Sequence, residues 1–402
     1  MRQIDNPYTP NAGARPPALV GRDAELNSFG VLLERLRRGR TEQSMLITGL
    51  RGVGKTVLLG ALEDQARAHN WTTIDAEITK NVEFGPRMSH LARRALLQVA
   101  PKVRWKERGR RAAGILKSFQ TTVSMQGEFT FGLDVDALEG FADSGSLGDD
   151  LTDVFVAIGE AAQEQRSGVV FLLDEIQFLS APELEALIAA LHKTVQRQLP
   201  LTLVGAGLPQ IPRLAGEAKS YAERLFQFPR IGELSDGEAR AAVVDPAKEL
   251  GVDYDEGAIQ AIIDYTEGYP YFLQEYGKIA WDIADGPTIT VADIEAAKSP
   301  VEAKLDSSFF RVRTDRVTQL ELQYMRAMAE LGDDAQSAKD VARLLNRTSE
   351  QLGPTRSRLI EKGLLYTPAH GLAAFTVPQF DRYMCRTYDL VVPTRGGRGS
   401  SV

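Results

Sequence analysis

The sequence predicts an α/β domain with a parallel sheet, then an all-helical segment, then a segment of three helices and a hairpin. Strand-like and helix-like patterns alternate through the first half of the chain, which is typical of parallel strands joined by helices. Val169–Leu173 is a continuous apolar run of the kind found in strands buried on both faces. From Glu233 onward, helical periodicity replaces this alternation.

The elements of the first half follow one another as strand, crossover helix and next strand. Gln43–Thr48 is a short apolar run that ends in a glycine-rich loop. Pro86 stands where the first turn of a helix tolerates proline. We expect strands at 43–48, 71–78, 169–173, 201–204 and 226–231, and helices at 57–68, 86–99, 151–165 and 182–198. These helices should cover both faces of the sheet.

One stretch at about residues 100–150 departs from this alternation. The apolar residues of Phe119–Met125 and Phe129–Val135 alternate on either side of a short turn, which predicts an inserted β-hairpin. A basic run at 102–117 precedes it, and a solvated helix face is favoured there over a contact with DNA or an acidic partner. The acidic, Gly/Ser-rich stretch 139–153 that follows is expected to be a mobile linker.

The second half divides into two predicted domains. Helical patterns separated by Gly or Pro indicate a small all-helical domain, with helices at 236–250, 255–266, 270–284 and 291–303. Three more helices and two short strands follow in the winged-helix pattern, at 319–331, 337–345, 351–362, 364–367 and 372–377. We expect domains at 1–232, 233–317 and 318–390, with a disordered tail at 391–402.

Composition and charge exclude several classes of protein. Of the 402 residues, 43% are apolar and 25% charged, which excludes a chain that is mainly disordered. No apolar run reaches the ~18 residues that span a bilayer, and residues 1–10 lack the layout of a secretion signal. One cysteine, Cys385, and four histidines exclude a disulfide framework and a thiolate zinc cluster. The net charge of −7 excludes nonspecific nucleic-acid binding by the whole chain. We expect a cytoplasmic protein with no membrane partner.

The segment Gly49–Thr56 matches the phosphate-binding pattern G-x-x-x-x-G-K-[ST], or P-loop. Its glycines let backbone N–H groups wrap around phosphate oxygens, and the following helix points its N-terminus at their charge. Lys55 is expected to reach the β- and γ-phosphates, and Thr56 to offer its hydroxyl to Mg²⁺. The predicted ATP-binding residues of this segment are Gly49, Leu50, Arg51, Gly52, Val53, Gly54, Lys55, Thr56 and Val57.

Two carboxylates follow the buried strand Val169–Leu173, about 120 residues after the P-loop. Asp174 is expected to hold Mg²⁺, and Glu175 to act as the general base that takes a proton from the attacking water. An apolar strand that ends in acids is a weak signal by itself, but its pairing with the P-loop makes it strong. The predicted catalytic residues are therefore Glu175 and Lys55, with Mg²⁺ as the cofactor.

The two motifs together resemble those of the AAA+ ATPases, particularly the origin-recognition initiator branch and its bacterial relatives. Leu19–Leu26 resembles the element that precedes the P-loop in these proteins and packs by the adenine. The resemblance therefore implies ATP contacts at Val20, Gly21 and Arg22. It covers about residues 16–390, apart from the predicted hairpin. It implies an AAA+ core, a helical lid and a C-terminal winged helix, with ATP bound between core and lid.

The sequence departs from that family in two places. The strand 201–204 runs into Gly-Ala-Gly-Leu-Pro at 205–209, where the family usually places a polar sensor residue, and Gln210 is a poor substitute. Thr266–Tyr271 lacks the arginine that many AAA+ proteins carry there. Its Gly-Tyr-Pro resembles instead the Gly-x-Pro of the signal-transduction (STAND-type) ATPases, which implies that Pro270 packs near the nucleotide. These departures predict slow turnover rather than loss of ATP binding.

Arg224 lies just before the predicted strand 226–231. The resemblance implies an arginine finger at this place, which would reach the ATP of a neighbouring subunit and contribute to catalysis. A surface arginine that pairs with Glu223 or another acid is an equally supported interpretation. Self-association through Arg224 therefore stays one of two alternatives.

The helix at 351–362 has the position of a recognition helix. At 100° per residue, Gln351, Thr355, Arg358 and Lys362 fall on one stripe apart from the apolar sector, and the predicted contacts with duplex DNA are Thr355, Arg358 and Lys362. An ordinary polar face or a protein contact is the alternative. Residues 301–402 carry 15 Lys/Arg against 12 Asp/Glu, so this region is only weakly basic.

Three functions are consistent with these motifs, all with ATP and ADP as ligands. The first is an ATPase that acts on DNA through its winged helix, of an initiator-like or mobile-element type. The second is a STAND-like signalling switch that acts on a protein partner, with slow hydrolysis. The third is a nucleotide-binding module without meaningful hydrolysis, which the missing sensor would allow.

Overall fold

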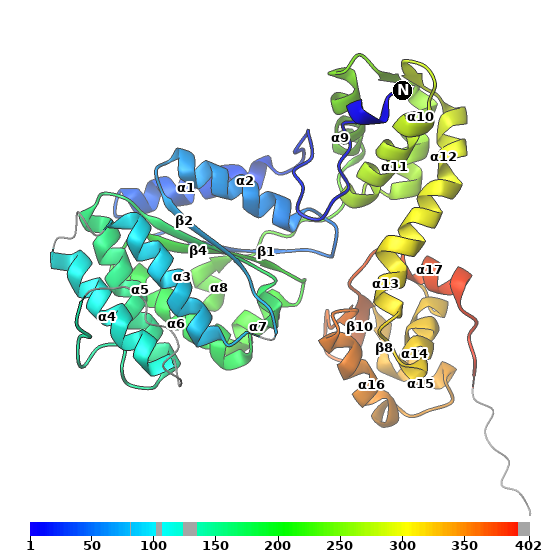
Figure 1. The fold of residues 1–402 in the computed structure, drawn as a ribbon. Helices are drawn as coiled ribbons and strands as arrows, with labels where there is room; N and C mark the ends of the chain where they lie inside the picture. The colour runs from blue at the N-terminus through cyan, green and yellow to red at the C-terminus, as the bar shows by residue number, and fades with distance from the viewer. Residues whose placement is uncertain (81, 102–106, 124–134, 393–402) are drawn as a thin grey trace, which may run out of the picture. The chain divides into compact units, whose positions relative to one another are not determined.

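The computed structural model describes residues 1–80, 82–101, 107–123 and 135–392 (Figure 1). Contacts group the chain into two compact units. One, called here the core unit, contains Gly21–Gly49 and Gly54–Ile231. The other, called the C-terminal unit, runs from Gly232 onward and also contains Met1–Val20 and the P-loop segment Leu50–Val53.

The core unit is built on a five-stranded sheet in the order β2-β3-β4-β1-β5, with parallel pairing throughout. Its strands are β1 (Ser44–Thr48), β2 (Thr72–Glu77), β3 (Val169–Asp174), β4 (Leu201–Gly207) and β5 (Phe226–Gln227). β4 lies between β1 and β3, so the carboxyl ends of these three strands meet at one edge of the sheet. The predicted parallel α/β fold is confirmed, although β5 is shorter than the strand expected at 226–231.

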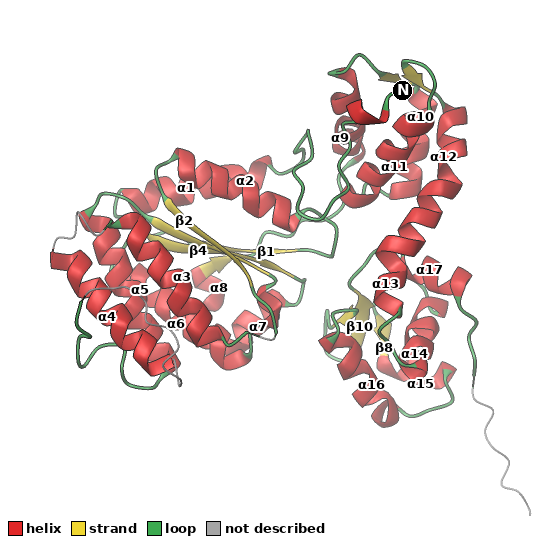
Figure 2. Cartoon of the chain, in the orientation of Figure 1, coloured by secondary structure: helices red, strands yellow, loops and turns green. Residues whose placement is uncertain are grey.

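Helices cover both faces of this sheet (Figures 1 and 2). One face carries α1 (Asp23–Arg37) and α2 (Lys55–Ala68). The other face carries α3 (Phe84–Val99), α5 (Leu147–Glu164) and α6 (Ala181–Gln196), and α4 (Glu107–Val123) packs against α3 and α5. Shorter helices follow β3 and β4, namely η3 (Ile176–Phe178), α7 (Ile211–Ala218) and α8 (Ala222–Leu225).

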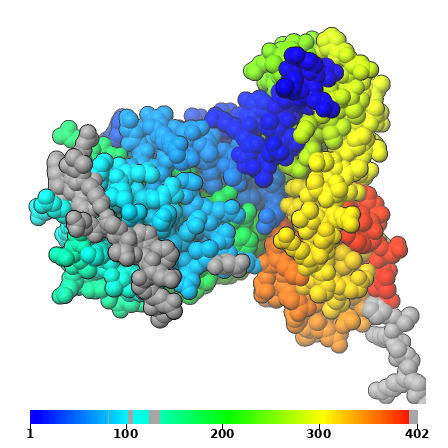
Figure 3. Space-filling model, viewed as in Figure 1, coloured from blue at the N-terminus to red at the C-terminus, as the bar shows by residue number. Residues whose placement is uncertain are grey.

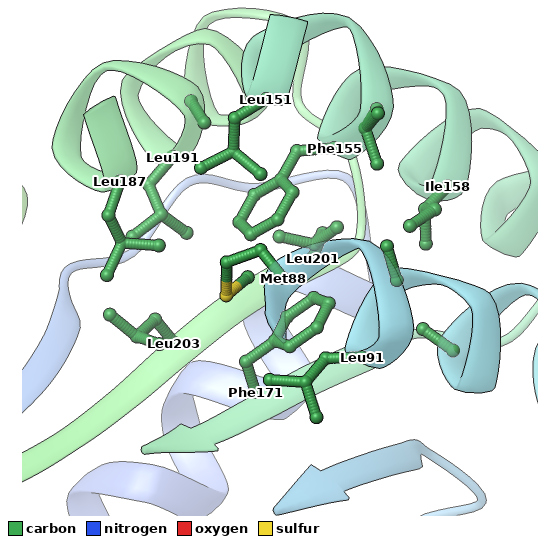
Figure 4. Close-up of a cluster of buried hydrophobic side chains, with 14 of the residues drawn as sticks. Met88, Leu91, Leu151, Phe155, Ile158, Phe171, Leu187, Leu191, Leu201 and Leu203 are labelled. Atoms are coloured by element: carbon green, nitrogen blue, oxygen red, sulfur yellow. The ribbon is translucent and has the colours of Figure 1, made fainter. Parts of the chain in front are cut away.

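A hydrophobic core between the sheet and α3, α5 and α6 holds β3, the strand that ends in Asp174, in place (Figure 4). Phe171 of β3 stacks on Phe155 of α5, with 5.0 Å between the ring centroids. Met88 and Leu151 pack beside these rings and are fully buried. Because such packing tolerates little movement, the carboxylates at the end of β3 stand on a rigid support.

The first strand of the predicted β-hairpin is wrong. Phe119–Val123 is the end of α4 and not a strand, because Phe119 shares a buried helical face with Ala112, Ile115 and Leu116. The remainder of the predicted hairpin, 124–134, lies outside the described residues, as does 102–106 of the basic run.

The stretch predicted as a mobile linker, 139–153, is instead ordered. The buried carboxylate of Asp150 accepts hydrogen bonds from the backbone N–H groups of Ser144 and Gly145, at 3.0 and 3.1 Å. Asp150 lies in the first turn of α5, which begins at Leu147. These hydrogen bonds to a buried carboxylate hold the loop before α5 in place.

The C-terminal unit begins with an all-helical part, called here the lid. Its helices are α9 (Asp236–Lys248), α10 (Glu256–Thr266), α11 (Pro270–Ile283) and α12 (Val291–Lys304). A short parallel pair, β6 (Asp253–Tyr254) and β7 (Thr288–Ile289), joins their connections. Capping boxes begin α9 at Ser235 and α12 at Thr290, which satisfies backbone N–H groups at both helix starts. α12 continues into η4 (Leu305–Phe310) and α13 (Arg311–Thr314).

The N-terminal segment packs on the lid (Figure 3). Among residues 1–20, its only helical turn is η1 (Gln3–Asp5). The buried Tyr8 hydroxyl donates to the Val243 carbonyl, and the Trp281 indole N–H donates to the Arg2 carbonyl. Gly277 leaves room for the Tyr8 ring, because a Cβ there would come within 2.7 Å of it. These contacts place residues 1–20 outside the core domain that was expected to begin at residue 1.

The rest of the unit has the expected order of three helices and a hairpin. The helices are α14 (Gln319–Glu330), α15 (Ala338–Leu344) and α16 (Ser349–Glu361). β8 (Gln336–Ser337), β9 (Leu365–Tyr366) and β10 (Leu372–Phe375) form a sheet in the order β8-β10-β9, and α17 (Phe380–Thr387) follows. This arrangement is winged-helix-like, as predicted. No helix in the described ranges is long and apolar enough to cross a membrane.

Candidate nucleotide-binding site

The P-loop connects β1 to α2 at the edge where the strands of the sheet end. The backbone N–H of Gly49 donates to the carbonyl of Gly207, the last residue of β4, at 3.1 Å. Gly54 has φ 89° and caps α2, so this position requires a residue that adopts left-handed backbone without strain. Lys55 is the first residue of α2. The loop therefore delivers its lysine and a helix N-terminus to the same place.

The Lys55 side chain turns back into the loop. It is buried, and its ammonium donates to the Gly49 carbonyl at 2.9 Å. A buried ammonium needs acceptors, and phosphate oxygens are better acceptors than a neutral carbonyl. The position of Lys55 therefore fits its predicted role toward the β- and γ-phosphates.

The two predicted Mg²⁺ ligands come together although they are far apart in sequence. The Thr56 hydroxyl at the start of α2 donates to Asp174 Oδ2 at the end of β3, at 2.6 Å. Mg²⁺ takes oxygen ligands and usually keeps several waters, with one or two protein groups and substrate phosphates completing its shell. A hydroxyl and a carboxylate beside a P-loop fit this donor set, so Thr56 and Asp174 are the residues that would hold the ion.

Glu175 directly follows the predicted metal ligand Asp174 and has a strained backbone conformation. Its φ of 54° and ψ of 35° are left-handed, which costs a non-glycine residue about 1 kcal/mol. Its backbone N–H donates to Asp174 Oδ1 at 2.8 Å, and its carboxylate accepts a hydrogen bond from the Gln177 side-chain amide. Strain of this kind collects at functional sites, where the surrounding structure sustains it.

The apex of the P-loop belongs to the C-terminal unit. The Arg51 N–H donates to the carbonyl of Thr376 in the winged helix at 2.9 Å, and the Tyr271 N–H donates to the carbonyl of Gly52 at 3.3 Å. Thr376 is itself fixed, because it is buried and its hydroxyl donates to the Gly363 carbonyl at 2.8 Å. Pro270, predicted to approach the nucleotide, opens α11 one residue before Tyr271.

A second arginine, Arg313, interacts electrostatically with Arg51 near this apex, and sequence analysis missed it. Burial, and then the charge of Arg51, lower the pKa of Arg313 to about 10. The Arg313 guanidinium lies over the Phe309 ring, 4.3 Å from its centroid. Two arginines that raise each other's electrostatic energy favour an anion beside them. Arg313 carries no motif in the sequence, so only the fold could reveal it.

The element expected beside the adenine leads into α1. Arg22 is buried, caps α1, and donates to the Gly21 carbonyl at 2.9 Å. Gly21 has φ 68°, a left-handed value that favours glycine. Val20 belongs to the C-terminal unit and Gly21 to the core unit. The adenine contacts of Val20, Gly21 and Arg22 stay a prediction.

Arg224 lies on α8 at the start of β5 and is exposed. Among the described residues, no ion pair involves its guanidinium, so the alternative that it pairs with Glu223 finds no support there. An exposed arginine at this place is available to a second molecule. Its role as an arginine finger stays a prediction.

One residue of the stripe predicted to face DNA is buried, and the two predicted contacts that are exposed are bound to an acid of their own domain. Thr355 is 1% exposed, so this candidate contact is wrong. Glu321 of α14 is fully buried and accepts hydrogen bonds from Arg358 at 3.2 Å and Lys362 at 2.7 Å. Burial would raise the pKa of Glu321, but the hydrogen bonds from Lys362, the Thr318 backbone and Arg358 lower it to about 2. Arg358 and Lys362 therefore neutralise a buried carboxylate of their own domain.

Two family models match the chain. The model described as "AAA ATPase domain" matches residues 18–204, and "Domain of unknown function (DUF8462)" matches residues 307–384. The first match contains both the P-loop and the acidic end of β3. The second spans most of the winged-helix region. No curated protein matches the chain by sequence.

Solved structures show where this fold has been seen. A Walker-type ATPase of Pyrococcus abyssi is 14% identical, with 92% of this chain and 97% of that chain covered and a TM-score of 0.56. The ORC2 protein of Aeropyrum pernix, solved as ADPNP and ADP complexes, is 17% identical, with 93% and 95% covered and a TM-score of 0.50. At these identities the likeness concerns the fold, which extends over nearly the whole chain.

Proposed function

We propose that the protein binds and slowly hydrolyses ATP, because residues 18–204 match the model of an AAA ATPase domain and the fold is similar to that of an ORC2 protein. The observation that carries the proposal is the 2.6 Å contact between Thr56 and Asp174, which joins the P-loop to the end of β3. This contact assembles the two halves of a phosphate and Mg²⁺ site from segments more than a hundred residues apart. Lys55 directly precedes Thr56 on α2, and Glu175 directly follows Asp174 at the end of β3.

Each residue has a defined role in this proposal. Lys55 donates to the β- and γ-phosphates, and the backbone N–H groups of Gly52–Thr56 bind the phosphate oxygens. Mg²⁺, when bound by Thr56 and Asp174, would neutralise phosphate charge. The water oxygen forms a bond to the γ-phosphorus while the bond to the bridging oxygen breaks. ADP keeps that electron pair, and the Glu175 carboxylate takes the water proton.

We also propose that the nucleotide state changes the position of the winged helix. The contacts that support this run from the P-loop apex to both parts of the C-terminal unit. Arg51 is tied to Thr376 and Gly52 to Tyr271 through backbone hydrogen bonds. Phosphate binding orders this same loop, so it biases whichever arrangement of the lid and winged helix fits the ordered loop best.

Two outputs of the winged helix are proposed. Duplex DNA is the first, through Arg358 and Lys362, as the domain type suggests. A protein partner, as in a STAND-like switch, is the second, and the surface of α16 favours it. Arg358 and Lys362 are already bound to Glu321, while the exposed residues of α16 include the acids Glu350 and Glu361. Carboxylates on the exposed face repel DNA phosphates.

A DNA titration with and without ATP, at several salt concentrations, separates these outputs. If DNA is the output, wild-type affinity falls with salt, and Arg358→Ala and Lys362→Ala each reduce the slope of log K against log salt by about 0.9. Gln351→Ala on the same helix is the control and should leave the slope unchanged. Absence of salt-dependent binding rejects DNA as the output and leaves the protein partner.

We expect Arg224→Ala to reduce turnover where the protein self-associates, because the exposed guanidinium would reach the γ-phosphate of a neighbouring subunit. The measurement is ATPase activity per molecule against protein concentration. Wild-type activity should rise with concentration, by about tenfold or more over the variant at the plateau. Arg213→Ala, an exposed arginine of α7 paired with Glu217, is the control. Flat wild-type activity, equal in the variant, would reject the intersubunit role.

A further inference from the structure

The end of β4 carries no polar side chain. β4 lies between the P-loop strand β1 and the carboxylate strand β3, and it ends in Gly205, Ala206 and Gly207. A group there would face both halves of the site. With no polar side chain on these three residues, β4 itself offers nothing to orient Glu175 or the water that attacks.

Gln177 reaches this place from the neighbouring element. It lies on η3, two residues after Glu175. Its side-chain N–H donates to Glu175 Oε2, and its side-chain carbonyl accepts from the backbone N–H of Leu208 at 3.1 Å. One amide thus joins the predicted base to the end of β4. Both ends of the amide are used, which fixes its orientation.

The glycines of β4 are what makes this bridge fit. A Cβ on Gly207 would lie 2.1 Å from Gln177 Oε1 and 2.5 Å from Ile211 Cδ1. A Cβ on Gly205 would lie 2.7 Å from Ile176 Cδ1. Real Cβ atoms do not approach other atoms so closely, so a side chain at position 207 would displace the Gln177 amide, and one at position 205 would displace the end of the Ile176 side chain. The bridge therefore depends both on the glycines of β4 and on Gln177 of η3.

We propose that Gln177 is the positioning residue for the hydrolytic base Glu175, and that it replaces the polar group absent from β4. The inference rests on the proposed function, in which Glu175 takes the proton of the water that attacks the γ-phosphorus. The amide N–H donates to one carboxylate oxygen of Glu175 and so fixes its position. The hydrogen bond from the Leu208 N–H holds the Gln177 amide at the end of β4. Gln177 acts through Glu175 and does not itself bind phosphate.

The test is Gln177→Ala in the full chain, with the single-turnover hydrolysis rate at saturating ATP and the Kd for ATP measured separately. We expect the rate to fall roughly 10- to 100-fold, because a base displaced by about 1 Å loses this much. The Kd for ATP should stay within about twofold, since Gln177 does not touch the P-loop in this proposal. Gln210→Ala is the matched control, a glutamine just past β4 that should leave both values unchanged.

A second variant tests the same bridge without altering either partner. Gly207→Ala should displace Gln177 and reproduce the loss of rate, whereas Gly216→Ala on α7, where a Cβ meets nothing within 4 Å, should not. In the double variant Gln177→Ala/Gly207→Ala, we expect little loss beyond that of Gln177→Ala, because the clash with Gln177 has been removed and the flexible end of Ile211 can move aside. Thermal unfolding of each variant identifies any that fails to fold.

Several results would overturn the inference. An unchanged or increased rate in Gln177→Ala shows that the amide does not help the base. Equal loss of ATP binding shows a general effect on the site. Multiplied losses in the double variant show that Gly207 acts independently of Gln177. A wild type that binds ATP but never hydrolyses it overturns the proposed hydrolysis as well, and so separates that failure from the others.

Discussion

Lys55→Ala should abolish ATP binding at concentrations that saturate the wild type. The variant removes a buried ammonium from the P-loop, where it donates to Gly49 and is placed to donate to phosphate. A charge-assisted hydrogen bond contributes about 1.5–3 kcal/mol, and Lys55 is expected to make more than one such bond to ATP. The Kd for ATP should therefore rise by about 100-fold or more. Equilibrium binding of a fluorescent ATP analogue measures this directly.

The control for this variant is Lys193→Ala, which removes an exposed lysine from α6. It should leave the Kd unchanged. Thermal unfolding without nucleotide should show that Lys55→Ala remains folded, because the substitution also removes the desolvation cost of a buried charge. If ATP affinity survives the loss of Lys55, the phosphates bind elsewhere and the assignment of Gly49–Thr56 fails.

Much of the core unit could be predicted because its signals are local. A strand buried on both faces is apolar at every position, and Val169–Leu173 has this pattern. The P-loop needs glycines, a lysine and a hydroxyl in fixed succession, so eight consecutive residues define it. The pairing of Thr56 with Asp174 follows from parallel strand order, which brings the ends of β1, β4 and β3 to one edge.

One error arose because the same residue pattern fits both a strand and a helix. Phe119 and Val123 fit strand alternation, but their four-residue spacing also fits a helix, and buried Ile115 and Leu116 decide for the helix. In the α16 stripe, Thr355 is buried and Arg358 and Lys362 are bound to Glu321, for a different reason. Helical projection treats each helix alone, whereas the buried Glu321 of α14 draws Arg358 and Lys362 toward its own helix.

Other features have no sequence signal because they depend on distant backbone. The hydrogen bond from Arg51 to Thr376 joins residues more than 300 apart through main-chain atoms, which every residue type carries. Gln177 forms its bridge only because β3 and β4 are neighbours in the sheet. The missing sensor at Gly205–Gly207 was visible in the sequence, but its replacement was not. A glycine in a strand often marks such a close approach by another group.

Glu175→Gln should keep ATP bound while hydrolysis falls by about 10²- to 10⁴-fold, the range that a general base contributes. The amide has the size of the carboxylate and can still accept a hydrogen bond from Gln177, so the left-handed turn and the P-loop should be unchanged. It cannot accept the proton of the attacking water. The measurements are the single-turnover hydrolysis rate and the Kd for ATP, with Glu185→Gln on the surface of α6 as the control.

This variant and Lys55→Ala separate binding from chemistry on the two sides of one site. Lys55 lies on α2 and Glu175 follows β3, so a general disturbance of the core unit would lower ATP binding in both. The proposal requires the opposite: ATP binding is lost in Lys55→Ala and kept in Glu175→Gln. If Glu175→Gln also fails to bind ATP, the carboxylate has a role in nucleotide or metal binding. If it hydrolyses ATP at the wild-type rate, a different group takes the proton, and Gln177 then has no base to position.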